Sequence, residues 1–182
     1  MPYDNLTDVQ KEAYVNSDAD LITLSTLEIY HPTFTESLKI VRDSTALTGA
    51  KIESGAPEAP GSTVTFQAFW FDFVPPEIDG QPDPTFDISV VNASGAITPY
   101  LESATESTVP IGVIYRTYLY DSANGTLLNG GQPSADPFYL EAFTAETQGN
   151  MAVFKIIMAP IGNRSFPSYT YTPEEFPGLL TL

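Results

Sequence analysis

Side chains that could perform nucleophilic or thiol chemistry are scarce in this sequence. It contains no cysteine and one histidine, His31, which Pro32 follows. A serine–histidine–aspartate triad would have to use His31, but no G-x-S-x-G turn is present to expose a nucleophilic serine. The lack of cysteine excludes thiol catalysis, disulfides, iron–sulfur clusters and cysteine-based zinc sites. We therefore interpret His31 as a histidine of a turn or strand edge and predict that the protein is not an enzyme.

An acidic stretch between Asp72 and Asp87 is the second place where chemistry could reside. Its carboxylates are Asp72, Glu77, Asp79, Asp83 and Asp87. Hard cations take several carboxylate ligands from one loop, in a spacing such as D-x-[DN]-x-[DN]-G-x5-E. This stretch lacks that spacing and its prolines stiffen it, so we interpret it as a solvated loop and expect no metal ion and no cofactor. A carboxylate pair for glycoside hydrolysis leaves no linear signal, and a cell-wall glycosidase stays open as an alternative.

The net charge of the sequence limits which kinds of molecule the protein is expected to bind. Seven basic residues face 23 acidic ones, which gives a net charge of −16. Such a surface repels phosphate backbones and anionic lipid, so neither nucleic acid nor membrane is expected as a partner. Self-association would have to bury apolar area or place rare cations, such as Arg42, Arg116 and Arg164, opposite carboxylates. Since the sequence shows neither a signal-peptide pattern nor a long apolar run, we expect a soluble protein made in a cytoplasm.

Hydrophobic periodicity predicts the elements that carry these residues. Strands are expected over 21–32, 36–44, 62–74, 85–92 and 109–121, and residues 138–160 are expected to form two strands joined as a hairpin at Gln148-Gly149-Asn150. Short helices are expected over 6–17 and 96–105, the second with Thr98 as its N-cap. No α/β alternation is present, which indicates a mainly β fold, a β-sandwich or barrel-like domain with short accessory helices. The predicted organisation is an N-terminal helical segment (1–20), a β domain (21–162) and an extended C-terminal arm (163–182).

The strand expected over 62–74 is apolar on both faces in its second half. Phe69, Phe71 and Phe73 lie on one face there, and Ala68 and Trp70 lie on the other. A strand with two apolar faces needs a partner on each face, either a second sheet of the same chain or a neighbouring subunit. These three phenylalanines are therefore candidate subunit contacts.

The C-terminal arm, NRSFPSYTYTPEEFPGLLTL, combines prolines with aromatic residues. Proline fixes φ and biases the preceding residue towards extended conformations, so ordering this arm would lose less entropy than ordering a flexible one. Four aromatic side chains could serve as apolar anchors. With Arg164 they complete the set of candidate contact residues: Arg164, Phe166, Tyr169, Tyr171 and Phe176. Whether the arm packs on its own domain or on a neighbour stays open.

Five segments of the sequence, taken in order, together resemble a known protein family. They are LKIVRDS, VTFQAFWFDFVPP, DISVVNASGAITPYLESA, VIYRTYLYD and NRSFPSYTYTPEEFPGL. The set resembles a family of short tail proteins of siphophages and related prophages, encoded in the tail-tip cluster just after the tape-measure gene. The resemblance spans residues 21–179 and is most specific in the last segment. The proline-rich stretches SGAPEAPG and PEIDGQPDP depart from the family pattern and are interpreted as surface loops.

The resemblance implies a structural component of the tail tip and offers no catalytic residue to carry over. The expected role is a subunit of the distal-tail ring that joins the tail tube to the hub or baseplate. The expected partners are further copies of the chain, the tail tube protein, and the hub, baseplate and tape-measure proteins. The expected location is the virion tail tip, after assembly in the host cytoplasm. A trimeric hub or baseplate subunit and a carbohydrate-binding module, with aromatic residues such as Trp70 as a platform, remain alternatives.

Overall fold

The computed structural model describes residues 11, 20–73, 85–92, 95–105 and 107–158. Strands dominate these residues, and their bounds are β1 (Leu21–Tyr30), β2 (Leu38–Val41), β3 (Leu47–Lys51), β4 (Thr63–Ala68), β5 (Phe71–Phe73), β6 (Thr85–Val91), β7 (Ile111–Asp121), β8 (Thr126–Leu127), β9 (Phe138–Gln148) and β10 (Met151–Met158). The helical elements are α2 (Thr98–Ala104) and the 3-10 turn η1 (Asn129–Gly131). None of the helices in this part of the chain has the length and hydropathy of a membrane span.

The described strands form a 10-stranded sheet in the order β3-β4-β2-β1-β7-β9-β10-β6-β5, with β8 paired to β7. Only Phe69 and Trp70 separate β4 from β5. The Phe69 N–H donates to the Val41 carbonyl (3.0 Å), and the Val91 N–H donates to the Trp70 carbonyl (2.9 Å). This segment therefore bonds to β2 near one end of the strand order and to β6 at the other, which curls the sheet into a barrel-like fold. The predicted mainly β, barrel-like fold is confirmed.

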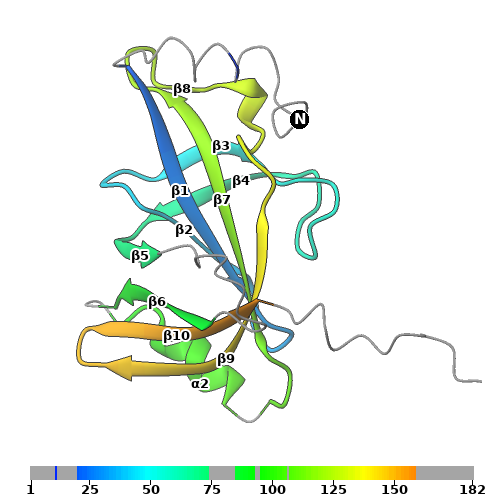
Figure 1. Ribbon diagram of the computed structural model, residues 1–182, viewed down its shortest axis with the longest axis vertical. Helices are drawn as coiled ribbons and strands as arrows, with labels where there is room; N and C mark the ends of the chain where they lie inside the picture. The colour runs from blue at the N-terminus through cyan, green and yellow to red at the C-terminus, as the bar shows by residue number, and fades with distance from the viewer. Residues whose placement is uncertain (1–10, 12–19, 74–84, 93–94, 106, 159–182) are drawn as a thin grey trace, which may run out of the picture.

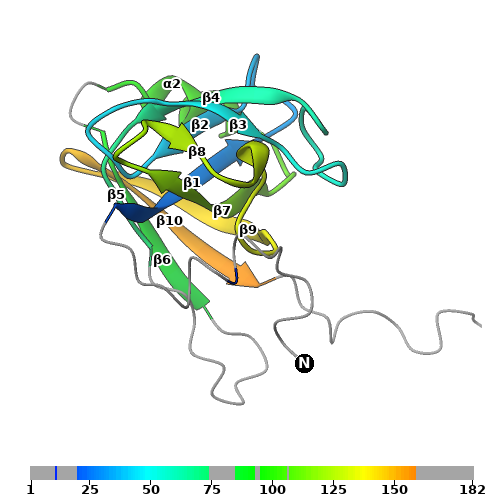
Figure 2. The same ribbon diagram turned by 90° about the horizontal axis from the view of Figure 1, so that it is seen from above.

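The long strands β1 and β7 are the central wall of the molecule. They pair antiparallel along their length, from Leu21 opposite Asp121 to Tyr30 opposite Gly112. The hairpin β3–β4 crosses them at one level, and β6, β9, β10 and α2 lie together at another (Figure 1). Figure 2 shows the same elements from above, with β1 and β7 between β3–β4 and β9–β10. Because both faces of this wall are covered, strands that the sequence shows as apolar on both sides are accommodated within one chain.

Two hydrophobic cores lie on opposite faces of the wall. Leu27 and Ile29 of β1 enter the larger core, which β2, β5, β6, β7, β9, β10 and α2 complete. Leu24 enters the smaller core beneath β3 and β4. The members of the smaller core are Leu24, Val41, Leu47, Ala50, Ile52, Ala56, Phe66 and Tyr118. Period-two alternation along β1 thus sends neighbouring side chains into different cores.

Several boundaries differ from the sequence-based expectation. The strand expected over 62–74 is broken into β4 and β5, and β3 and β8 were not predicted. Thr98 is not the N-cap of α2: Ile97 occupies that position without a side-chain cap, and the Thr98 Oγ1 instead accepts a hydrogen bond from the Asn92 Nδ2 (3.0 Å). The helix expected over 6–17 and the arm over 163–182 lie outside the described residues, apart from Lys11.

Candidate functional site

A fully buried arginine lies in the face of the wall that β3 and β4 cover. The side chain of Arg116 has 0% exposure, and so does that of Glu28. Arg116 is opposite Thr26 in the β1–β7 register, which makes Glu28 its diagonal neighbour on the same face. The Arg116 Nη1 donates to the Glu28 Oε2 at 2.7 Å. The sheet register itself therefore brings these two charges together.

Glu53, in the segment after β3, forms the second pair with Arg116. The Arg116 Nε donates to the Glu53 Oε2 (2.7 Å), and the Nη2 donates to the Glu53 Oε1 (2.9 Å). This two-point geometry matches the planar guanidinium to the carboxylate and is stronger than a single hydrogen bond. The connection ties the segment that follows β3 to the central strand β7.

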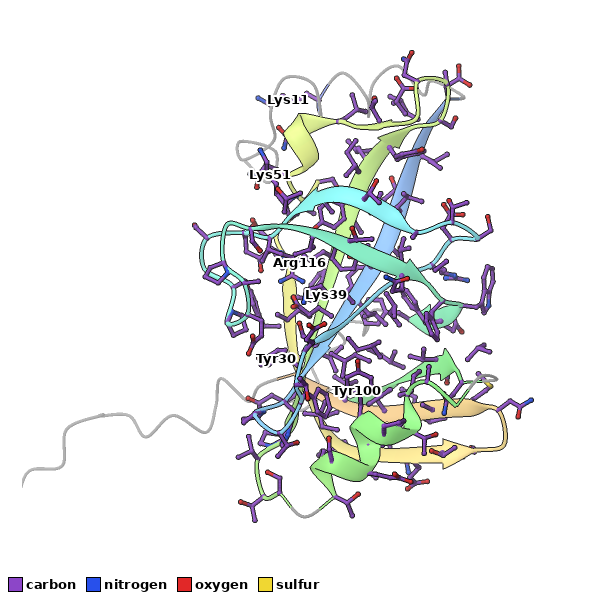
Figure 3. The ribbon with its side chains drawn as sticks, turned by 180° about the vertical axis from the view of Figure 1, so that it is seen from behind. Lys11, Tyr30, Lys39, Lys51, Tyr100 and Arg116 are labelled. Atoms are coloured by element: carbon purple, nitrogen blue, oxygen red, sulfur yellow. The ribbon has the colours of Figure 1, made fainter. Side chains whose placement is uncertain are left out.

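Polar side chains complete this Arg116 cluster, which we define as Glu28, Lys39, Glu53, Arg116 and Tyr139. The Lys39 Nζ lies 3.2 Å from the Glu28 Oε1, and the Tyr139 hydroxyl donates to the Glu53 Oε1 at 2.7 Å. Figure 3 shows Lys39 and Arg116 close together where β3 and β4 cross the wall. Two cations thus face two carboxylates, so the cluster carries no net charge in its interior.

The electrostatics of the cluster favour its ionised form. Burial lowers the pKa of Arg116, but the hydrogen bonds to Glu53 and the charge of Glu28 outweigh it and raise that pKa above its ordinary value. Burial raises the pKa of Glu53, whereas the hydrogen bonds from Arg116 and Tyr139 lower it, and the pKa ends below its ordinary value. Burial and the hydrogen bond to Glu53 raise the pKa of Tyr139 to about 12. These shifts maintain the charged carboxylate and the neutral phenol at neutral pH.

The cluster has the properties of a structural anchor. A glycosidase needs one carboxylic acid with a raised pKa and a second carboxylate facing it across the substrate. Here Arg116 occupies the space between Glu28 and Glu53, and the pKa of Glu53 is lowered. Among the described residues no buried side-chain nitrogen or oxygen lacks a hydrogen-bond partner. The cluster therefore offers no unpaired group to a substrate.

His31 lies at the end of β1 and holds two loops together. Its side chain is buried, its Nε2 lies 3.1 Å from the Val109 carbonyl, and its Nδ1 lies 2.7 Å from the Thr33 Oγ1. The Thr33 N–H donates to the same Nδ1 (3.2 Å), which makes Nδ1 the acceptor and leaves the Nε2 proton for the carbonyl. Both ring nitrogens are thus engaged with the protein itself, as the interpretation of a strand-edge histidine requires.

An open groove lies between α2 and β9 on another part of the surface. It has a volume of about 650 Å³ and is lined by α2, by residues 107–110, by Ile111 and by β9 from Ala142 to Thr147. Its rim exposes Val109 (49%) and Phe143 (53%). The β9–β10 register passes from Thr144 to Ala142 without pairing Phe143, so Phe143 is the extra residue of a β-bulge. We call this feature the α2–β9 groove.

The three phenylalanines predicted as subunit contacts differ in how deeply they are buried. Phe71 is 1% exposed and Phe73 is 9% exposed, and both belong to the larger core. Phe69 is partly buried against the same core. The second partner of this strand is therefore the chain's own core, and these side chains offer little area to a neighbour. Trp70, between them, is 61% exposed, and its ring lies 5.0 Å from the guanidinium carbon of Arg42.

The other predicted contact residues, namely Arg164, Phe166, Tyr169, Tyr171 and Phe176, lie outside the described residues. So do Glu77, Asp79 and Asp83 of the acidic stretch. Within the described ranges no group of three or more histidine or acidic residues could hold a metal ion. Asp72, at the start of that stretch, is exposed and lies 3.8 Å from Arg42.

Sequence reasoning missed the Arg116 cluster, although a signal for it exists. Glu28 lies between two apolar residues in LEIY, and Arg116 lies within the largely apolar strand VIYRTYLY. A charge within a strand covered on both faces needs a buried partner. The α2–β9 groove has no comparable signal, because it depends on where the helix lies against a bulged strand.

Comparison with known proteins identifies one family and no curated relative. A family model described as a domain of unknown function (DUF1833) matches residues 9–171, which is most of the chain. No curated protein matches the sequence.

Proposed function

The chain belongs to the DUF1833 family, and from the sequence resemblance and the site geometry we propose that it is a structural subunit of a bacteriophage tail tip. Its specific role would be a subunit of the distal-tail ring, which joins the tail tube to the hub or baseplate. It would act without catalysis and would assemble with further copies of itself. Its location would be the tail tip of the virion.

The observation that carries this proposal is the contrast between satisfied chemical groups and an open apolar-rimmed groove. The buried charges of the Arg116 cluster are paired with one another, and both ring nitrogens of His31 bond to protein atoms. Val109 and Phe143, by comparison, expose about half of their surface at the α2–β9 groove. Exposed apolar residues of this kind support a role in contacts between proteins.

Charge supports the same role by restricting how copies could meet. Arg116 is buried within the chain, and Arg42 lies against Trp70 and Asp72 of the same chain. With a net charge of −16, identical subunits repel one another unless apolar contacts offset the repulsion. Contacts between copies would therefore depend on apolar residues rather than on ion pairs with these two arginines.

The proposal is tested by locating the protein in virions. A phage carrying an epitope tag on this protein should show the tag at the tail tip by immunogold electron microscopy, and deletion of the gene should yield tails with incomplete tips. Complementation with the wild-type gene is the control. Tails that are complete and infectious without the protein would overturn the proposal. Sixfold copy number supports the distal-tail role, and threefold copy number supports the alternative of a hub or baseplate subunit.

Trp70 favours a second candidate, a carbohydrate-binding module of the tail tip. Its ring is 61% exposed, which suits stacking against a sugar. The same ring lies near the Arg42 guanidinium, and tryptophan and arginine are both also enriched at protein interfaces. Binding on a glycan array that the Trp70→Ala variant loses would support this candidate, and an array without signal would rule it out.

A further inference from the structure

We propose that the α2–β9 groove is the receptor for the C-terminal arm of a second copy of this chain. The inference rests on the proposed function, because it names the contact through which subunits of the tail-tip ring would join. It assigns different surfaces to the two sides of the contact, the arm on one copy and the groove on the next.

The groove has the size and lining that an extended peptide needs. Its volume of about 650 Å³ lies within the roughly 300–1,000 Å³ of typical ligand pockets. Small side chains, among them Ala104, Ala142 and Ala145, line it, while Val109 and Phe143 stand at its rim. Small residues leave room between the helix and the strand, and the rim offers apolar area to an incoming aromatic ring.

The low charge of the groove favours docking of a second copy of this acidic chain there. Among the described residues that line it, Glu102 carries the one charge. The first eleven residues of the arm, 163–173, contain Arg164 and no acidic residue, and the two glutamates of the arm, Glu174 and Glu175, follow them. In a protein with a net charge of −16, these are two segments that can approach without strong repulsion. Arg164 also supplies a cation that could face Glu102.

The direction of β10 favours the arm of a neighbour over the chain's own arm. β10 pairs antiparallel with β9 and ends at Met158, opposite Leu140. At that point the chain runs towards Phe138, away from the part of β9 between Ala142 and Thr147 that lines the groove. The chain's own arm would have to reverse before it could enter, whereas the arm of another copy meets no such requirement.

The arm is long enough to reach another subunit. The chain continues from residue 159 to residue 182. At about 3.3 Å per residue, 24 residues could span at most roughly 80 Å, which is more than a domain of this size measures. Contacts between two different surfaces of identical subunits repeat head to tail and close into a ring when the rotation allows. The geometry therefore suits a cyclic assembly.

Disulfide trapping tests the proposal, because the chain contains no cysteine of its own. The groove variant is Val109→Cys, the arm variant is Tyr171→Cys, and the matched control is Thr126→Cys, on exposed β8. Full-length single variants are mixed at high concentration and high salt, which screens the repulsion between subunits. We expect disulfides between groove and arm to exceed those between control and arm by at least about tenfold, as expected for docked partners.

Two further measurements separate the outcomes. Phe143→Ser, added to the groove variant, should lower the yield of that disulfide while the control disulfide is unchanged. The double variant Val109→Cys/Tyr171→Cys, oxidised at low concentration, should form no more internal disulfide than Thr126→Cys/Tyr171→Cys. Equal yields at groove and control positions, or an excess of internal disulfide in the groove double variant, would overturn the inference.

The outcome is independent of the tail-tip assignment. Trapping without the protein in virions would leave the contact standing and refute the tail-tip function. Immunogold labelling of the tail tip without trapping would leave the function standing and refute this contact.

Discussion

The Arg116 cluster and the α2–β9 groove differ in whether their side chains have partners within the chain. In the cluster, the Arg116 guanidinium, with 0% exposure, donates to the carboxylates of Glu28 and Glu53. Lys39 also pairs with Glu28, and the Tyr139 hydroxyl donates to Glu53. In the groove, Val109 and Phe143 remain about half exposed beside an open volume of about 650 Å³. A region whose groups are all paired stabilises the chain itself. A region with unpaired apolar surface is available to another molecule.

This difference predicts that substitutions in the cluster lower the stability of the chain, whereas substitutions in the groove impair assembly. Removing the central cation of the cluster takes the closest positive charge from the buried Glu28 carboxylate, which is costly. Removing an apolar side chain from the rim of the groove changes little within the folded chain. The predictions that follow test this separation, beginning with the largest expected effect.

Arg116→Met should have the largest effect on stability. It leaves Glu28, which is fully buried, without its closest cation, and breaking a buried pair in this way typically costs about 3–5 kcal/mol. The free energy of unfolding in urea measures the loss. Arg42→Met is the control, because the Arg42–Asp72 pair is exposed and such pairs contribute about 0–1 kcal/mol. Equal losses in the two variants would contradict the structural role of the cluster.

Acidification should weaken the cluster through Glu53. The pKa of Glu53 is lowered in the folded chain relative to its ordinary value of 4.5, so its contribution is present above that pH and is lost as the pH falls through the folded value. The unfolding free energy should therefore decrease on acidification below about pH 5, and less steeply in Glu53→Gln. Identical pH profiles of the variant and the wild type would show that Glu53 does not contribute.

Tyr139→Phe should have a moderate effect. It removes the hydrogen bond from the phenol to the Glu53 carboxylate, but the residue is 45% exposed, so we expect a loss of only about 0.5–1 kcal/mol. The phenol has a pKa of about 12, raised from 10.0, so its contribution is present below pH 10 and disappears as the pH rises through 12. Absorbance titration of tyrosinate, compared between variant and wild type, measures that pKa. A Tyr139 pKa of 10 would contradict the bond.

Phe143→Ser should have the smallest effect on stability. Phe143 is 53% exposed and is the extra residue of the β9 bulge, so the unfolding free energy should change by no more than about 0.5 kcal/mol. The same variant should impair association between copies, measured by analytical ultracentrifugation at high salt. Met151→Ser, at the exposed first residue of β10, is the control that should leave association intact. A large loss of stability in Phe143→Ser would place this residue in the core instead.

Local alternation predicted much of the sheet because β1, β6, β7, β9 and β10 have clear apolar patterns. β3 was missed for a physical reason. Its pairing with β4 shifts between Leu47 and Ala50, and Gly49 has a φ of 80°, a left-handed conformation that favours glycine and interrupts the alternation. A bulge of this kind hides a strand from a period-two search.

The candidate site was less predictable, because it depends on contacts between distant segments. The apolar pattern at Phe71 and Phe73 predicts two covered faces but cannot tell the chain's own core from a neighbour. The pair of Arg116 and Glu28 follows from the register of β7 on β1, and Glu53 joins it from a different part of the chain. Only the three-dimensional arrangement shows that these charges pair with one another within the chain.

A reconstruction of the phage tail tip tests the central claim most directly. The account predicts a closed ring of copies of this chain between the tail tube and the hub, with part of the C-terminal arm of each copy docked in the α2–β9 groove of its neighbour. A ring with empty grooves would contradict the docking contact alone. A tail tip that contains no copy of the chain would contradict the structural function itself.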